Sequence, residues 1–246
     1  MKKALVFTVY DRVNYFQQTL HHWREVRGLK DWDVIFSIEP SDVLPHMIEE
    51  IQMFMEDVNI DAQIIVNPER YGVLQHPWVA LQNLFINDNY DFVVRAEDDL
   101  IVSDDILEYF SWAAETYKTD NDVATVHGMS FDPTGSNPSR VARVAGFNPW
   151  IWGTWRHHWI EYISPTWDHD YSTFNVFPGN QSGWDWNLNT RVFPALKFVG
   201  IYPEVSRVDN IGVVGTHGTE SNFRPSPSFR REISSTLYQE SGKIGA

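Results

Sequence analysis

Three consecutive carboxylates, Glu97, Asp98 and Asp99, directly follow the strand-like run 92–96. Like charges at the end of a core strand raise one another's pKa unless a cation joins them. A hard divalent ion with oxygen ligands relieves that repulsion and can also hold a phosphate-bearing ligand. The triplet therefore predicts a Mn²⁺ or Mg²⁺ site with Asp99 as the metal ligand. The alternative is an acidic turn that places negative charge near the start of the next helix.

A second group suited to chemistry is Trp184-Asp185-Trp186. A carboxyl group between two indole rings loses part of its contact with water, which raises its pKa toward the range useful for a general base. Asp185 is therefore the candidate catalytic base. The alternative is a helix-capping aspartate followed by core packing of the two tryptophans.

The glycine-rich segment 212–218 contains His217. It predicts either a loop that closes over phosphates, with His217 donating to them or binding the metal, or a plain glycine turn. His76 precedes Pro77, and a histidine in that place is typical of a surface or capping position. Arg12 follows Asp11 and is expected either to pair with it or to reach a phosphate.

The elements that position these residues alternate between strand and helix over the first hundred residues. Continuous apolar runs predict strands over 4–10, 32–38, 63–66 and 92–101. Helical spacing predicts helices over 13–26 and 44–55, and a third that starts at Pro77. This alternation predicts an α/β fold with a mostly parallel sheet, which binds ligands beyond the carboxyl ends of its strands. Three of those ends carry Asp11-Arg12, Glu39 and the acidic triplet.

The second half of the chain has weaker patterns. They predict a helix over 104–118, a loop over 132–138, and strands over 123–127, 140–144 and 198–202. Residues 149–186 are rich in tryptophan, glycine and proline, which predicts loops and short helices along a pocket wall. We expect one domain over 1–246, with a nucleotide-sugar half (1–128), an acceptor and catalytic half (129–220) and a tail or lid (221–246).

Composition narrows the functional classes. The 246 residues carry a formal net charge of −14, which argues against nucleic acid as a partner. There are no cysteines, so disulfides and zinc–thiolate sites are excluded. No apolar run approaches the roughly 18 residues of a membrane span. We therefore expect a soluble, cytoplasmic protein.

Several motifs together resemble a known family, the inverting glycosyltransferases of the N-acetylglucosaminyltransferase I type. Protein O-mannose N-acetylglucosaminyltransferases are similar in the acidic segment. The motifs follow the family's order over most of residues 4–220. They are Thr8-Val9-Tyr10-Asp11-Arg12, His76-Pro77-Trp78, Glu97-Asp98-Asp99-Leu100, Asn148-Pro149-Trp150, Trp184-Asp185-Trp186 and Thr216-His217-Gly218.

This resemblance implies a Rossmann-like GT-A fold with a tryptophan-rich C-terminal acceptor region, a UDP-sugar donor such as UDP-GlcNAc, and Mn²⁺ or Mg²⁺. Arg12 would contact the nucleotide, and Glu39 stands where the family often has an aspartate beside uracil. His76 would lie beside uracil, and His217 would belong to the stretch that leads into the loop that closes over the donor. Glu97 and Asp98 are expected to accept hydrogen bonds from ribose and sugar hydroxyls, and Trp184 to hold a sugar face.

The resulting expectation is a metal-dependent inverting transferase that moves a sugar to a carbohydrate or glycoconjugate hydroxyl. Asp185 would remove the proton from that hydroxyl. Two other classes remain open at this stage: a carbohydrate-binding protein without transfer activity, and a metal-dependent hydrolase of phosphate esters.

Overall fold

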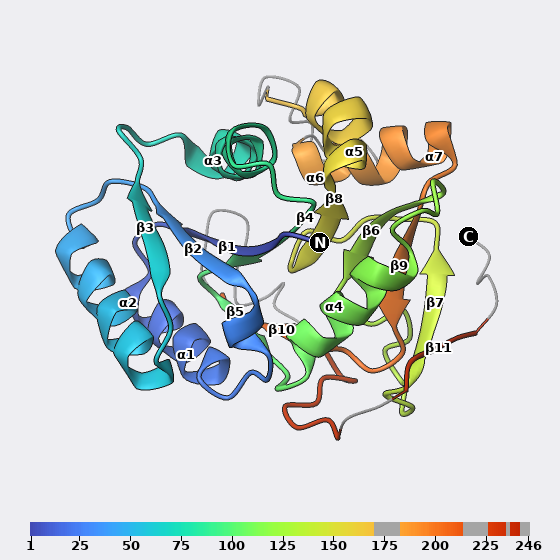
Figure 1. Cartoon of the computed structure of the whole chain (residues 1–246), viewed down its shortest axis with the longest axis horizontal. Helices are drawn as coiled ribbons and strands as arrows, with labels where there is room; N and C mark the ends of the chain where they lie inside the picture. The colour runs from blue at the N-terminus through green and yellow to red at the C-terminus, as the bar shows by residue number, and fades with distance from the viewer. Residues whose placement is uncertain (170–182, 214–225, 235–236, 242–246) are drawn as a thin grey trace.

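A nine-stranded mixed sheet forms the centre of the protein (Figure 1), in a computed structural model that describes residues 1–169, 183–213, 226–234 and 237–241. The strand order is β11-β7-β9-β6-β8-β4-β1-β2-β3. Strands β1 to β4 run parallel to one another, while β8 runs antiparallel to both of its neighbours, β4 and β6. The expected α/β fold with a mostly parallel sheet is confirmed.

The first half of the chain contains β1 (Lys3–Val9), α1 (Val13–Trp23), η1 (Leu29–Asp31), β2 (Asp33–Ile38), α2 (Leu44–Val58), β3 (Ala62–Val66), α3 (Gly72–Gln82), η2 (Asn83–Asn87), β4 (Phe92–Glu97), β5 (Leu100–Val102), α4 (Ile106–Thr116) and β6 (Val123–His127). The second half contains β7 (Arg140–Val144), β8 (Trp152–Trp155), α5 (Arg156–His158), η3 (Trp159–Ile163), η4 (Ser164–Thr166), α6 (Trp184–Asn187), η5 (Leu188–Val192), α7 (Phe193–Leu196), β9 (Val199–Pro203), β10 (Val208–Asn210) and β11 (Gln239–Glu240).

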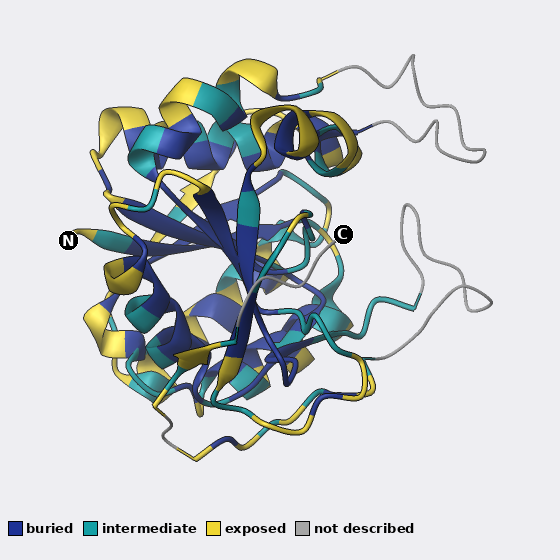
Figure 2. Ribbon diagram, turned by 90° about the vertical axis from the view of Figure 1, so that its right-hand side faces the viewer, coloured by how far each residue is buried: buried dark blue, intermediate teal, exposed yellow. Residues whose placement is uncertain are grey.

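Two layers of helices cover the sheet and give the protein two apolar cores. Helices α1, α2 and α4 lie on one face, and α3, α5, α6 and α7 lie on the other (Figure 1). Figure 2 shows the strands buried between these layers. Strand β1 feeds both cores because successive side chains point to opposite faces: Phe7 and Val9 join one cluster, and Val6 joins the other.

Strand β8 occupies a central position that the sequence patterns did not predict. Its four residues pair with Phe92–Arg95 of β4 on one side, and three of them pair with Thr125–His127 of β6 on the other. The expectation of only loops and short helices over 149–186 was therefore wrong here. Trp152 and Trp155 point to opposite cores, and a Cβ at Gly153 would lie 2.5 Å from the ring of Phe92. Glycine thus permits the close approach of the two strands.

The acidic triplet does not lie within one strand, as the prediction of a strand over 92–101 implied. Strand β4 ends at Glu97, and a turn at Asp98 and Asp99 leads into β5, which pairs antiparallel with β10 in a separate two-stranded sheet. The two buried carboxylates therefore sit where the chain leaves the main sheet.

Part of the expected tail packs against the body of the protein. Strand β11 extends the sheet by pairing with β7, and the backbone N–H of Asp104 donates to the Arg231 carbonyl at 2.8 Å. In the described residues, no helix combines the length and the apolar character needed to cross a membrane.

Candidate active site

The predicted site residues of the first half converge at the carboxyl edge of the parallel strands. Thr8 of β1 is in register with Glu97 of β4, so the segments after both strands start side by side. The N–H of Tyr10 donates to Asp98 Oδ2 at 3.1 Å. Glu39 follows β2 at the same edge, where its N–H donates to the Val9 carbonyl. This is the edge at which open α/β sheets bind ligands.

Arg12 joins the two buried carboxylates of the triplet. Its guanidinium donates to Asp98 Oδ1 and, at 2.6 Å, to Asp99 Oδ2. Arg12 therefore pairs with these aspartates, and no bond to its neighbour Asp11 is present among the described contacts. Burial raises the pKa of Asp98, while Arg12 opposes the shift. Arg12 thus supplies part of the positive charge that these neighbouring carboxylates require.

Asp99 keeps one oxygen for another partner. The residue is only 5% exposed, and its buried Oδ1 has no hydrogen-bond partner among the described residues. Burial and the charge of Glu97 raise the pKa of Asp99 to about 6, against the opposing effect of Arg12. Gly212 lies against the other oxygen of the Asp99 carboxylate, because a Cβ at position 212 would lie 2.1 Å from Oδ2. A buried orphan carboxylate oxygen is a costly arrangement that a bound cation relieves.

These features fit a divalent ion held by a single carboxylate. Among the described residues no group of three or more His, Cys, Asp or Glu side chains could form a complete protein cage. Mg²⁺-type ions in nucleotide sites use one or two carboxylates and take their other ligands from water and substrate phosphates. Asp99 Oδ1 has the chemistry for that one ligand.

Glu39 organises the start of helix α3. Its Oε1 accepts hydrogen bonds from the backbone N–H groups of Tyr71 and Gly72, both at 2.6 Å. Gly72 has φ +77°, a conformation that favours glycine. Glu39 is 3% exposed. Its two hydrogen bonds fix the chain between β3 and α3 at the edge of the site.

His76 is buried, not at the surface or at a helix cap as one interpretation of the sequence had it. Its Nε2 lies 2.9 Å from Ser37 Oγ on β2. Burial and the nearby charge of Arg95 lower the pKa of His76 to about 3, so the ring is neutral at physiological pH. It can exchange neutral hydrogen bonds, but it does not supply a positive charge.

The structure also adds Arg70, a residue at this edge that the sequence analysis missed. Its guanidinium lies over the ring of Tyr10, 4.2 Å from the centroid. Among the described residues it has no carboxylate partner, unlike Arg12 and Arg95. Tyr10 and Arg70 are 60 positions apart in sequence, so only the fold brings them together. A guanidinium of this kind offers donors to an anionic or carbonyl-bearing ligand.

Arg95 connects the acidic triplet with the tryptophan-rich region. It forms an ion pair with Glu97 at 2.7 Å and donates to Thr8 Oγ1. Its guanidinium also lies over the ring of Trp184, 5.4 Å from the centroid. Segments 87 residues apart thus meet at one place.

Trp184 is a core residue. It is 3% exposed and stacks on Trp167 with ring centroids 4.5 Å apart and an interplanar angle of 7°. Its Nε1 donates to the Val73 carbonyl on α3 at 3.3 Å. In this arrangement its ring contacts protein, so a role in holding a sugar face requires the indole to move.

Helix α3 begins at Gly72, so the prediction that it starts at Pro77 was wrong. Proline is common in a first helical turn, but Pro77 lies in the interior of this helix. An interior proline leaves the carbonyl four residues earlier without its helical donor, and here that carbonyl belongs to Val73. The Nε1 of Trp184 replaces the missing donor.

Asp185 lies in the first turn of α6, after Gly183 at the N-cap with φ +115°. It is half-buried, between the buried Trp184 and Trp186, which is 37% exposed. Asp185 is therefore not the N-cap itself. The predicted residue His217 lies outside the described residues.

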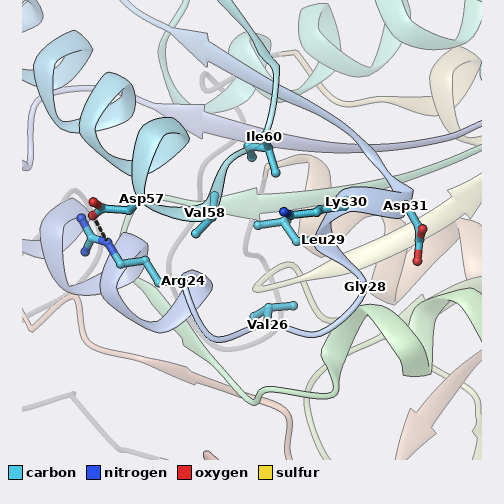
Figure 3. Close-up of a pocket in the computed structure, with 9 residues that line it drawn as sticks. All are labelled: Arg24, Val26, Gly28, Leu29, Lys30, Asp31, Asp57, Val58 and Ile60. Carbon is cyan, nitrogen blue, oxygen red and sulfur yellow. Dashed lines mark hydrogen bonds and ion pairs between the residues drawn. The ribbon is translucent and has the colours of Figure 1, made fainter.

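Two further cavities lie elsewhere and contain none of the predicted residues. One, of about 570 Å³, lies where α1 and α2 end, at the amino edge of the sheet (Figure 3). Arg24 and Asp57 form a 2.8 Å ion pair beside it. The other, of about 640 Å³, includes Trp155 and His157. The convergence of the predicted residues, not cavity size, identifies the candidate site.

Comparisons with known proteins agree with the fold and the motifs. No curated protein matches the chain by sequence. Among solved structures, the mannosyltransferase PcManGT from Pyrobaculum calidifontis, in complex with GDP-Man and Mn²⁺, is 15% identical with a TM-score of 0.53, covering 82% of this chain and 54% of that one. Residues 1–349 of TarS from S. aureus are 11% identical with a TM-score of 0.56, covering 85% and 60%.

The chain thus spans little more than half the length of these two structures, and at such identities the likeness shows a shared GT-A fold alone. A family model matches residues 46–174, just over half of the chain, and includes the acidic triplet, His76 and β8. The chain belongs to the GNT-I family.

Proposed function

We propose that this protein is a metal-dependent inverting glycosyltransferase that takes a sugar from a UDP-sugar. The proposed donor is UDP-GlcNAc, and the transferred sugar is GlcNAc. The acceptor is a hydroxyl of a carbohydrate or glycoconjugate. The observation that carries the proposal is the buried, unpartnered Oδ1 of Asp99 at the carboxyl edge of the sheet. The family match and the implied donor of that family support the choice of nucleotide sugar.

On this proposal the donor lies along the edge formed by β1, β2 and β4. Tyr10, Arg70 and His76 line the nucleotide end, with the Glu39-capped turn beside them. Glu97 and Asp98 accept hydrogen bonds from ribose or sugar hydroxyls. The oxygens of Asp98 already have donors, but each carboxylate oxygen can accept more than one hydrogen bond.

Asp99 would hold the divalent ion through Oδ1, and the ion when bound neutralises charge on the diphosphate leaving group. Arg12 donates to Oδ2 of the Asp99 carboxylate, and it is proposed to contact the nucleotide as well. His217, from the glycine-rich segment, is proposed as an additional contact to the phosphates or the metal.

Asp185 is the proposed general base. It accepts the proton of the acceptor hydroxyl while that oxygen forms a bond to the anomeric carbon. The bond from this carbon to the diphosphate oxygen breaks with its electron pair, and the configuration inverts. Holding both substrates in line supplies much of the rate enhancement. Trp184 is proposed to complete the acceptor side.

A nucleotide-sugar screen tests the proposal. We expect Mn²⁺ together with UDP or UDP-GlcNAc to raise the unfolding temperature, and Mn²⁺ alone or GDP to raise it less. NMR of the product should show inversion at the anomeric carbon. D99N should abolish the Mn²⁺-dependent shift, whereas D122N, at an exposed aspartate away from the site, should keep it. A flat response across all nucleotides in the wild type would favour a carbohydrate-binding protein instead.

A further inference from the structure

An interior proline and a buried indole donor satisfy each other in this fold. Pro77 has no N–H, so the Val73 carbonyl on the preceding turn of α3 loses its helical donor. Trp184 is buried, and a buried indole N–H is stabilised by an acceptor. The two come together at 3.3 Å between Trp184 Nε1 and Val73 O.

The next residue of α3 makes a similar contact. The Nε1 of Trp167 donates to the Leu74 carbonyl at 2.8 Å, and Trp167 stacks on Trp184. Two parallel indoles are thus bonded to consecutive carbonyls of one helix. Arg95 lies over Trp184 as well, which leaves that ring few alternative positions.

This contact joins the two sides of the candidate site. Helix α3 carries His76 and starts at the turn fixed by Glu39. Trp184 directly precedes Asp185 and lies in the same first turn of α6. We therefore expect a shift of the closely packed Trp184 indole to displace Asp185 as well.

We infer that Pro77 is a positioning residue for the reaction. It leaves the Val73 carbonyl without a helical donor, so that this carbonyl anchors Trp184. The anchored Trp184 in turn sets the position of Asp185 relative to helix α3. The inference rests on the proposed role of Asp185 as the base. It assigns a function to a proline that would otherwise only weaken α3.

The variant P77A tests the inference because alanine restores a helical N–H to the Val73 carbonyl. That carbonyl then accepts from two donors, and we expect it to hold the Trp184 indole less closely. We expect kcat to fall roughly tenfold, since small displacements of a catalytic group are costly, with little change in the KM for the donor. The unfolding temperature should not fall, because alanine suits a helix interior better than proline. The near-ultraviolet circular dichroism of the stacked tryptophans should change.

W184F removes the donor and keeps an aromatic ring, and we expect it to lower kcat as well. If Pro77 acts through Trp184, the double variant P77A/W184F should lose little more than W184F alone. P45A provides the matched control, because Pro45 lies in the first turn of α2, where a missing N–H frees no carbonyl. P45A should leave kcat and the dichroism signal unchanged.

Three outcomes overturn the inference: unchanged kcat and dichroism in P77A, additive losses in the double variant, or a fall in kcat that only follows a fall in the unfolding temperature. The proposed function is judged separately, by the nucleotide screen and by D185N. Should D185N stay active while P77A still changes the dichroism, the anchor would stand as a structural contact and the base assignment would fall.

Discussion

The guanidinium of Arg95 lies over the ring of Trp184, and the same guanidinium forms a 2.7 Å ion pair with Glu97. One arginine on a central strand therefore contacts both the acidic triplet and the residue before Asp185. Arg95 is 3% exposed, so these contacts are made away from bulk water, where electrostatic interactions are stronger. The donor-side and base-side predictions concern one connected region.

The first prediction concerns the base. We expect D185N to lower kcat by a factor of about 10² to 10⁴, the usual contribution of general base catalysis. UDP-sugar binding should change little, because Asn keeps the shape of the side chain. Steady-state kinetics and thermal shift with UDP and Mn²⁺ measure the two quantities. Near-normal turnover would remove Asp185 from the mechanism.

The second prediction concerns Arg70. Replacing it in R70Q removes a charged donor from the proposed nucleotide end of the site, and charged hydrogen bonds contribute about 1.5–3 kcal/mol. We therefore expect the KM for the donor to rise about tenfold or more, with a smaller effect on kcat. R191Q, which removes an exposed arginine on η5, should leave the KM unchanged. Equal effects of both variants would point to a general loss of positive charge.

The third prediction concerns Gly212, which lies against the Asp99 carboxylate. In G212A the new Cβ would lie 2.1 Å from Asp99 Oδ2, so the carboxylate or the segment around residue 212 must move. We expect the Mn²⁺ concentration for half-maximal activity to rise severalfold. G146A is the comparison, because its Cβ would meet only the Asn189 side chain, at 3.3 Å. An unaltered Mn²⁺ requirement in G212A would show that this contact does not position the carboxylate.

The fourth prediction concerns acid stability. Burial lowers the pKa values of both His76 and His127 to about 3. Below pH 6.5 the unfolded chain binds protons that the folded protein excludes, so these residues contribute stability that is complete above pH 6.5 and is lost as pH falls toward 3. Each contributes a slope of about 1.4 kcal/mol per pH unit in that window.

Urea unfolding at several pH values between 7 and 4 measures this slope. His127 is hydrogen-bonded to Thr125 and Asn148 and lies outside the proposed machinery, so H127Q isolates one of the two contributions. H127Q should be less stable at pH 7, through lost packing, but its stability should decline less steeply with acid. An unchanged slope would contradict the buried, neutral state of His127.

The sequence predicted the parallel strands and the position of the acidic turn because their signals are local. Apolar runs mark β1, β2 and β4, and polar residues mark the ends of those strands. Strand β8 was not predicted, because Trp152-Gly153-Thr154-Trp155 is short and contains glycine, which is depleted in strands. Pro77 misled the prediction for α3, because the tryptophan that makes an interior proline tolerable lies more than a hundred positions later.

Partners within the site were also beyond local patterns. The sequence left Arg12 with either Asp11 or a phosphate, and the structure gives it Asp98 and Asp99. Arg70 was not predicted as a site residue, because no local pattern in the sequence indicates its contact with the ring of Tyr10. The roles of the individual site residues remain predictions that the variants above test.

The central position of β8 has a consequence for how the chain folds. Strand β4 cannot gain its second neighbour until residues 152–155 arrive, nearly 60 positions later, and β6 depends on the same strand. Closing so long a segment is entropically slow, and pairings between distant segments delay folding. A nascent or truncated chain ending near residue 128 would expose the unpaired edge of β4. The half that is proposed to bind the donor is therefore expected to complete its folding only together with the half that contains Asp185.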